Sequence, residues 1–344
     1  MSFATTVGVD AMPNRTVNLT IQVPILQTGL PPVITGGQES KRFFKVNQTA
    51  ATVADALDLL ETKTIGNIVL NQTKSIIIGE DIARRDVKPV LDHFIRTNQM
   101  PLPAYIFVAA GVTAEEVLSL EPAQGRLPGT LFIAAGQSAT KMDMTYFIPH
   151  WEFQQKLAHR AKDAFAPLIG IDRTHRLYLI SGLAVFNGNR MAGKLSSHEV
   201  EIFGLLTGSQ KSGLMLFNPA GHHLSLRNVQ GKSKIKVHIE QGRPSYQIET
   251  VVYGSITELT LPQLTVSPQD VARFQKTIAQ EIEKGIGDLI KKLQQYNADI
   301  IDFGEELRVQ HQNVWKKTDW KRTFPTVPFS VKVKVHIEGD GNFR

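Results

Sequence analysis

The 344-residue sequence contains no cysteine. This absence excludes disulfides, thiolate metal sites and cysteine nucleophiles, but it does not identify the compartment, because many extracytoplasmic proteins also lack disulfides. The sequence has no run of about 18 apolar residues, so it predicts no membrane-spanning helix. It shows no signal peptide, no repeat of fixed period and no low-complexity segment. The composition, with 42% hydrophobic and 20% charged residues, is typical of a globular protein with a real core.

The common catalytic signatures are also missing. The sequence has neither the His-Glu-x-x-His motif of zinc proteases nor the Gly-x-Ser-x-Gly motif of serine hydrolases. His222 and His223 are adjacent, so on a strand they would point to opposite faces. His150 and His159 are too far apart for the i, i+4 spacing that places two ligands on one helical face. We therefore expect no enzymatic activity, no metal site and no cofactor.

One segment resembles a phosphate-binding loop. Residues 188–194 have the spacing G-x4-G-K, follow a predicted strand and precede a predicted helix. A phosphate loop needs a Ser or Thr hydroxyl directly after the lysine to bind magnesium, but Leu195 stands there. Asn187 and Gly188 also suit a tight hairpin turn, because both residues tolerate positive φ. A nucleotide hydrolase that uses Lys194 stays an alternative, which this mismatch disfavours.

Alternating strand and helix patterns predict a first α/β domain at residues 1–122. Thr113 and Glu116 form a capping box, which predicts the start of its last helix. A segment with two prolines and two glycines at 121–130 predicts a linker. The predicted strands lie near 3–10, 17–23, 76–78 and 104–110, and the predicted helices lie near 50–61, 80–95 and 113–120.

The second predicted domain spans residues 123–215. We expect a helix near 151–164 and a strand near 177–186, which turns at Asn187-Gly188 into a brief returning strand. Ser196 and Glu199 form a second capping box, which predicts a helix that ends near Leu206.

The third predicted domain, at residues 216–344, has the clearest pattern. Strands near 234–239 and 246–259 precede an amphipathic helix that Ser267 caps, about 30 residues or about 45 Å long. The last strand alternates apolar and polar residues from Phe329 to Glu338. The predicted fold class is therefore α+β, with three mixed α/β domains, the last a long helix packed on an antiparallel sheet.

Two rows of lysines lie on predicted strands of this third domain. The chain as a whole carries a net charge of +6 and has a pI of about 9.3. Like charges directly opposite on neighbouring strands repel, so we expect the two rows to be offset, separated, or facing an acidic partner or anionic lipid. The rows form a candidate interaction surface that consists of Lys232, Lys234 and Lys236 on one strand and Lys332 and Lys334 on the other.

A basic module that binds anionic lipid or nucleic acid through these lysine rows is a second alternative. Nucleic-acid binding normally requires stacking aromatics between the basic residues, or a basic helix that enters a groove. Neither feature accompanies the rows, so we expect no nucleic acid as a partner.

Three segments, which together cover essentially the whole chain, resemble a known family. The first comprises residues 74–85, 90–96 and 104–110, and the second is residues 182–199, which begin Gly-Leu-Ala-Val-Phe-Asn-Gly. The third is Asp-Phe-Gly-Glu-Glu-Leu-Arg at 302–308, followed by Trp315, Trp320 and the alternating strand at 331–337. Taken in this order, the segments resemble the C subunit of the spore germinant receptor, the Ger(x)C lipoprotein family of endospore-forming bacteria.

This resemblance implies a non-enzymatic, three-domain lipoprotein at the outer face of the spore inner membrane, held there by a lipidated cysteine. It also implies that the protein works with two integral membrane subunits, A and B, in responding to nutrient germinants. The sequence departs from the family because it lacks the lipobox cysteine, and a strand is predicted directly after Met1. We therefore interpret Met1 as an artificial start and expect that the targeting segment and the anchor are missing.

Overall fold

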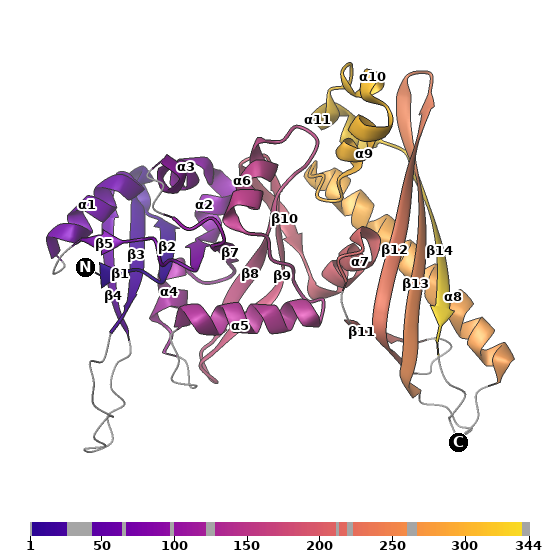
Figure 1. The fold of residues 1–344 in the computed structure, drawn as a ribbon, viewed down its shortest axis with the longest axis horizontal. Helices are drawn as coiled ribbons and strands as arrows, with labels where there is room; N and C mark the ends of the chain where they lie inside the picture. The colour runs from indigo at the N-terminus through magenta and orange to yellow at the C-terminus, as the bar shows by residue number, and fades with distance from the viewer. Residues whose placement is uncertain are drawn as a thin grey trace.

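The computed structural model describes residues 2–25, 43–63, 67–96, 100–121, 128–210, 213–218, 223–259 and 267–338. It contains an eight-stranded sheet and a four-stranded sheet that lie at opposite ends of an elongated molecule (Figure 1). The mixture of helix and strand confirms the predicted α+β class. Most of the predicted linker at 121–130 lies outside the described residues.

The eight-stranded sheet has the order β10-β9-β8-β7-β6-β2-β3-β4. Its central strands β2, β6, β7 and β8 pair in parallel, and its outer strands pair antiparallel. The strands are β2 (Thr6–Ala11), β3 (Val17–Pro24), β4 (Phe43–Ala50), β6 (Ser75–Ile78), β7 (Tyr105–Ala109), β8 (Phe165–Asp172), β9 (Leu177–Asn187) and β10 (Arg190–Leu195). A small separate pair joins β1 (Ser2–Phe3) to β5 (Ile68–Val69).

Helices cover both faces of this sheet, because alternate residues of its central strands are apolar on both sides. Ile76 and Ile78 belong to one buried cluster, while Ile77 belongs to the other. The helices of this part are α1 (Val53–Lys63), α2 (Glu80–Arg85), α3 (Lys88–Arg96), α4 (Ala114–Ser119), α5 (Pro128–Lys141) and α6 (His150–Ala158). The predicted capping box of Thr113 and Glu116 is present at the start of α4.

The first half of the predicted second domain differs from the expectation. The helix predicted at 151–164 ends at Ala158, and the following apolar segment forms β8, which pairs in parallel with β7. A short apolar run can belong to a helix or to a buried strand, so periodicity did not identify this strand. One sheet therefore continues past the predicted boundary at residue 122, and the division of the chain into three domains stays a prediction.

The four-stranded sheet has the order β11-β12-β13-β14. Its strands are β11 (Gly213–Phe217), β12 (Leu224–Glu240), β13 (Arg243–Leu259) and β14 (Phe329–Ile337). The expectation of a purely antiparallel sheet is wrong, because β14 runs parallel to β13. The chain returns from the end of β13 through a long helix, α8 (Pro268–Tyr296), and such a crossover delivers a parallel strand.

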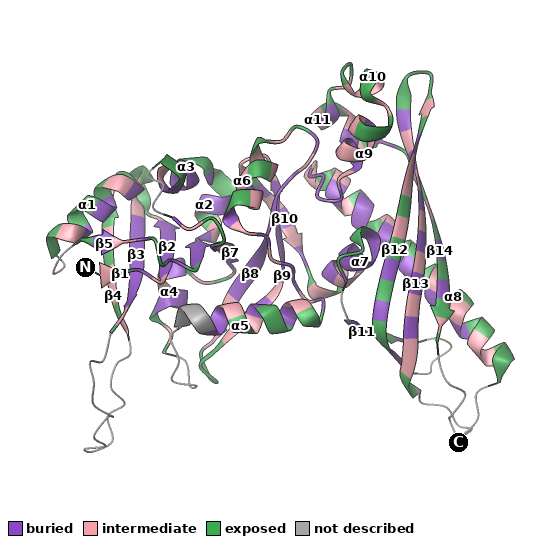
Figure 2. Cartoon of the chain, viewed as in Figure 1, coloured by how far each residue is buried: buried purple, intermediate pink, exposed green. Residues whose placement is uncertain are grey.

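Helix α8 packs its apolar stripe on one face of this sheet. Ser267 and Asp270 form its capping box, with Pro268 in its first turn, as predicted. Figure 2 shows buried residues alternating with exposed or half-buried ones along β12 and β13, so the other face of the sheet is accessible in the described part of the chain. The buried residues of α8 are Phe274, Ile278, Ile282, Ile286, Leu289, Ile290 and Leu293.

Helix α7 (Ser197–Thr207) lies between the two sheets and contacts both of them. Its predicted capping box is present, and the capping residue Glu199 also pairs with Lys292 of α8 at 2.6 Å. Close packing requires glycine on β12, because a Cβ at Gly231 would lie 2.3 Å from the backbone oxygen of Leu205.

We expect Gly231→Ala to lower the free energy of unfolding by about 1–3 kcal/mol, because the added methyl group overpacks a backbone contact. The matched control is Gly287→Ala in α8, where a Cβ would meet nothing within 4 Å. This control should raise stability by up to about 1 kcal/mol, because alanine favours a helix over glycine. Urea unfolding measures both changes, and equal stability of the two variants would contradict the packing of α7 on β12.

Candidate interaction surface

The two predicted lysine rows lie on the open face of the four-stranded sheet. Lys232, Lys234 and Lys236 belong to β12, and Lys332 and Lys334 belong to β14. Strand β13 runs between them, so the rows are separated and no lysine directly opposes another.

The residue of β13 between the two rows is acidic. Glu249 pairs in register with Lys234 on one side and with Lys332 on the other. Its carboxylate lies 3.5 Å from the ammonium of Lys236 and accepts a hydrogen bond of 3.2 Å from the amide of Gln247. A single carboxylate among five lysines leaves this part of the face positively charged, and exposed pairs of this kind stabilise the fold by at most about 1 kcal/mol.

An aromatic contact lies at one end of the same face. The ammonium of Lys232 lies 5.8 Å from the centre of the Tyr253 ring, and His336 stacks on that ring at 5.3 Å. The face thus combines basic side chains with one half-buried aromatic residue. This combination suits an acidic protein surface or an anionic headgroup.

The phosphate-loop alternative does not fit the geometry of residues 188–194. Asn187 of β9 pairs with Arg190 of β10, so the segment is a β-hairpin and not a strand followed by a helix. The ammonium of Lys194 lies 2.7 Å from the carboxylate of Glu80. Partial burial opposes ionisation of Glu80, but hydrogen bonds from Lys194 and Arg84 hold the pKa of this carboxyl below its usual value.

The histidines do not meet in the described part of the chain. His150 begins α6 and is buried, whereas His159 follows the same helix and its ring accepts a hydrogen bond from the backbone of Ala161. His223 is exposed, and His222 lies outside the described residues. Among the described residues, no group of three or more His, Cys, Asp or Glu side chains could hold a metal ion.

An ion pair with one buried partner connects the two parts of the molecule, and the sequence patterns did not reveal it. Asp163 lies just before β8, is 3% exposed and accepts two contacts of 2.6 and 2.7 Å from the ammonium of Lys321. The same carboxylate accepts the backbone N–H of Gly188 at 3.0 Å and that of Asp299 at 2.7 Å. Lys321 belongs to α11 (Trp320–Thr323) and also donates to Asn187 at 2.8 Å.

Asp299 is the second buried carboxylate at this junction. It follows α8 and accepts the N–H groups of Phe303 at 3.0 Å and Gly304 at 2.7 Å at the start of α9 (Phe303–Gln310). It also accepts the indole N–H of Trp320 at 3.0 Å. A single charged residue inside the apolar run Ala298–Ile301 was the available signal, since a buried charge needs several partners.

Loss of the Lys321 charge tests the ion pair. We expect Lys321→Met to lower the free energy of unfolding by up to about 3 kcal/mol, because it leaves the Asp163 carboxylate buried without its cation. The exposed Lys317→Met serves as the control and should change stability by less than about 0.5 kcal/mol. Denaturant unfolding measures the stability of both variants. Similar stability would contradict a stabilising role of the pair between Asp163 and Lys321.

The second carboxylate predicts a pH dependence. Burial raises the pKa of Asp299 to about 7, against the opposing hydrogen bonds from Gly304 and Phe303. Because the folded-state pKa is raised, the folded protein binds this proton more tightly than the unfolded chain does. The contribution of this group to stability is therefore complete below pH 3.8 and is lost as the pH rises to about 7.

We expect the free energy of unfolding of the wild type to fall relative to that of Asp299→Asn as the pH rises from 4 to 7. Asparagine cannot lose the proton, so only the wild type loses stability through this group. Urea unfolding at several pH values measures the difference. A difference that does not change with pH would contradict the raised pKa.

No helix in the described part of the chain combines the length and the apolar character that a membrane span requires. Two family models match the chain. The model for the spore germination protein N-terminal domain matches residues 1–171. The model for spore germination B3/GerAC like, C-terminal, matches residues 181–341.

Several curated proteins are similar over most of their length. Spore germination protein B3 of Bacillus subtilis (strain 168) is 24% identical over 98% of this chain and 90% of its own length. Spore germination protein GerQC of Bacillus cereus is 23% identical over 89% of this chain and 84% of its own length.

The crystal structure of the GerBC protein has the same fold. It matches with a TM-score of 0.59 and 20% sequence identity, and the match covers 98% of both chains. The two family models together account for nearly every residue from 1 to 341. The chain therefore belongs to the Ger(x)C family of spore germination proteins, the C subunits of germinant receptors.

Proposed function

We propose that this chain is a non-enzymatic subunit of a nutrient germinant receptor and acts by protein contacts with the membrane subunits A and B. Family membership over nearly the whole chain carries the proposal. In this proposal the protein lies at the outer face of the spore inner membrane. The lipid anchor would be attached outside these 344 residues, which contain no cysteine.

The lysine face is the surface that we assign to these contacts. It is open to solvent, lies on the opposite side of the sheet from α8, and carries five lysines around Glu249. A partner surface rich in carboxylates would complement it and speed association. The junction of Asp163, Asp299 and Lys321 supports this role, because it holds the four-stranded sheet at a set orientation to the rest of the chain.

An anionic membrane surface is the second candidate for this face. Lysines near an anionic leaflet each contribute about 1 kcal/mol of attraction, and this attraction falls within a Debye length. Vesicles with and without anionic lipid separate the candidates. Binding that requires anionic lipid and disappears at high salt would favour the membrane, whereas indifference to lipid charge would favour a protein partner.

Charge reversal on the lysine face tests the proposed function. In spores that lack the native copy, we expect the full-length lipidated protein with Lys332→Glu and Lys334→Glu to slow nutrient germination at least about tenfold, because the reversed charges would repel an acidic partner surface. The loss of spore absorbance after nutrient addition measures the rate.

The control variant, Lys316→Glu with Lys317→Glu, makes the same change in net charge on an exposed segment elsewhere. It should germinate like the wild type, with equal protein levels by immunoblot. Normal nutrient germination of spores that lack the protein altogether would refute the receptor role itself.

A further inference from the structure

The four-stranded sheet closes one of its free edges with side chains. Strand β12 extends beyond β11, and Gln310 of α9 lies against this extension. The Gln310 amide donates to the carbonyl of Ile235 at 3.0 Å and accepts the N–H of Val237 at 3.0 Å. The ring of His311 contacts the carbonyl of Val237 at 3.0 Å. These side chains substitute for a neighbouring strand and block further pairing there.

Among the described residues, no strand pairs with the opposite edge of the sheet, on β14. The N–H of Tyr246 donates to Pro328 at 2.9 Å, and the N–H of Glu338 donates to Gly254 at 2.8 Å. In a parallel ladder these two bonds direct the backbone of the even-numbered residues of β14 toward β13. The backbone groups of Val331, Val333 and Val335 therefore point away from the sheet.

One contact within the chain confirms this direction. The N–H of Val333 donates to the carboxylate of Glu283, on α8, at 3.3 Å. Glu283 is exposed, and its oxygen occupies the position that the carbonyl of an added strand would take. Among the described residues, the structure gives no such partner to the N–H groups of Val331 and Val335.

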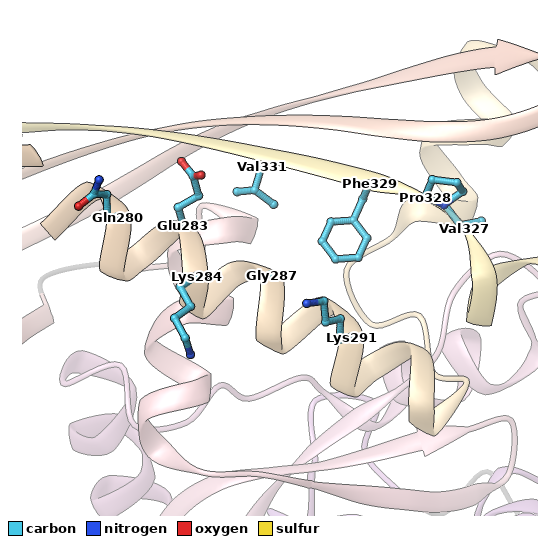
Figure 3. A pocket seen from close by; sticks show the side chains of 9 residues that line it. All are labelled: Gln280, Glu283, Lys284, Gly287, Lys291, Val327, Pro328, Phe329 and Val331. Atoms are coloured by element: carbon cyan, nitrogen blue, oxygen red, sulfur yellow. The ribbon is translucent and has the colours of Figure 1, made fainter. Parts of the chain in front are cut away.

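A groove of about 520 Å³ runs beside this edge, between α8 and the first half of β14. Figure 3 shows Phe329 projecting from β14 toward the helix, with Gly287 on the facing side of α8. A Cβ at Gly287 would meet nothing within 4 Å, so the helix leaves open space there. The groove has an apolar wall on β14 and polar residues on α8, among them Gln280, Glu283, Lys284 and Lys291.

We propose that this edge and groove bind an extended segment of a partner protein, which pairs with β14 as a fifth strand and carries acidic residues at alternate positions. Backbone hydrogen bonds would supply affinity, and alternate side chains would supply specificity. The inference rests on the proposed function only in assigning the segment to a receptor subunit.

The charge pattern of β14 specifies the partner. On the open face, side chains of an added strand would lie beside Lys332 and Lys334, where opposite charges contribute about 0.2–1 kcal/mol per pair. On the other face, alternate side chains would enter the groove beside Phe329 and Val331 and should be apolar. A second copy of the chain fits poorly, because pairing β14 with itself would bring the two lysine rows together.

The probe is a fluorescein-labelled, end-capped peptide of eight residues that alternates glutamate and valine. A peptide that alternates lysine and valine is its control. We expect the purified protein to bind the glutamate peptide at least tenfold more tightly by fluorescence anisotropy. Hydrogen exchange followed by NMR should then slow at the amides of Val331 and Val335. It should not change at Lys332 and Lys334, whose N–H groups already bond to β13.

Two variants test the groove and the edge separately. Gly287→Phe fills the groove and should weaken binding of the glutamate peptide at least tenfold, whereas Gly287→Ala should change it less than twofold. Val331→Pro removes one outward N–H without removing a bond to β13, and it should also weaken binding, since proline is tolerated on an edge strand. Circular dichroism verifies that each variant is folded.

Binding without slower exchange at Val331 and Val335 would overturn the inference, because the peptide would then occupy only the lysine face. Equal affinity for both peptides would overturn it too. A concentration-dependent dimer that Gly287→Phe abolishes would assign the edge to a second copy instead. Spores that carry Gly287→Phe distinguish the two proposals: normal germination there, together with failure in spores that lack the protein, would reject the edge and leave the proposed function standing.

Discussion

Two buried carboxylates hold the two sheets of this protein together. Asp163, at the start of β8, and Asp299, after α8, exchange backbone and side-chain hydrogen bonds, and Lys321 neutralises the first of them. Taking a carboxylate out of water costs several kcal/mol unless it finds enough partners. The partners of the two groups come from the hairpin of β9 and β10, the end of α8 and α11, so these segments must be in place together. The orientation of the four-stranded sheet therefore depends on this junction.

An aromatic cluster continues from the junction into the sheet. Trp320 donates to Asp299, and its ring lies 6.3 Å from that of Tyr246 on β13. Tyr246 stacks on Phe303 at 4.3 Å, and its hydroxyl donates to the backbone of the same residue at 2.7 Å. Such pairs add about 0.5–1.5 kcal/mol beyond area burial. The cluster thus connects the segment around Asp299 to β13, the strand that carries Glu249.

The two faces of the four-stranded sheet differ in what they contact. Its apolar side packs on α7 and α8, where close approach at Gly231 leaves no room for a larger residue. In the described part of the chain, its polar side and its β14 edge remain accessible, with lysines that discourage pairing between copies. The charged face and this edge are the surfaces to which we assign the proposed protein contacts.

Local signals determined the elements that the sequence could predict. The three capping boxes and the stripe of α8 depend on residues three or four positions apart, so their hydrogen bonds and packing can be read along the chain. Tertiary structure alone decided the pairing of β7 with β8, the parallel return of β14, and the placement of Glu249 between the lysine rows. These features depend on contacts between residues far apart in sequence. Such contacts stabilise the protein only once the strands have assembled into the sheet.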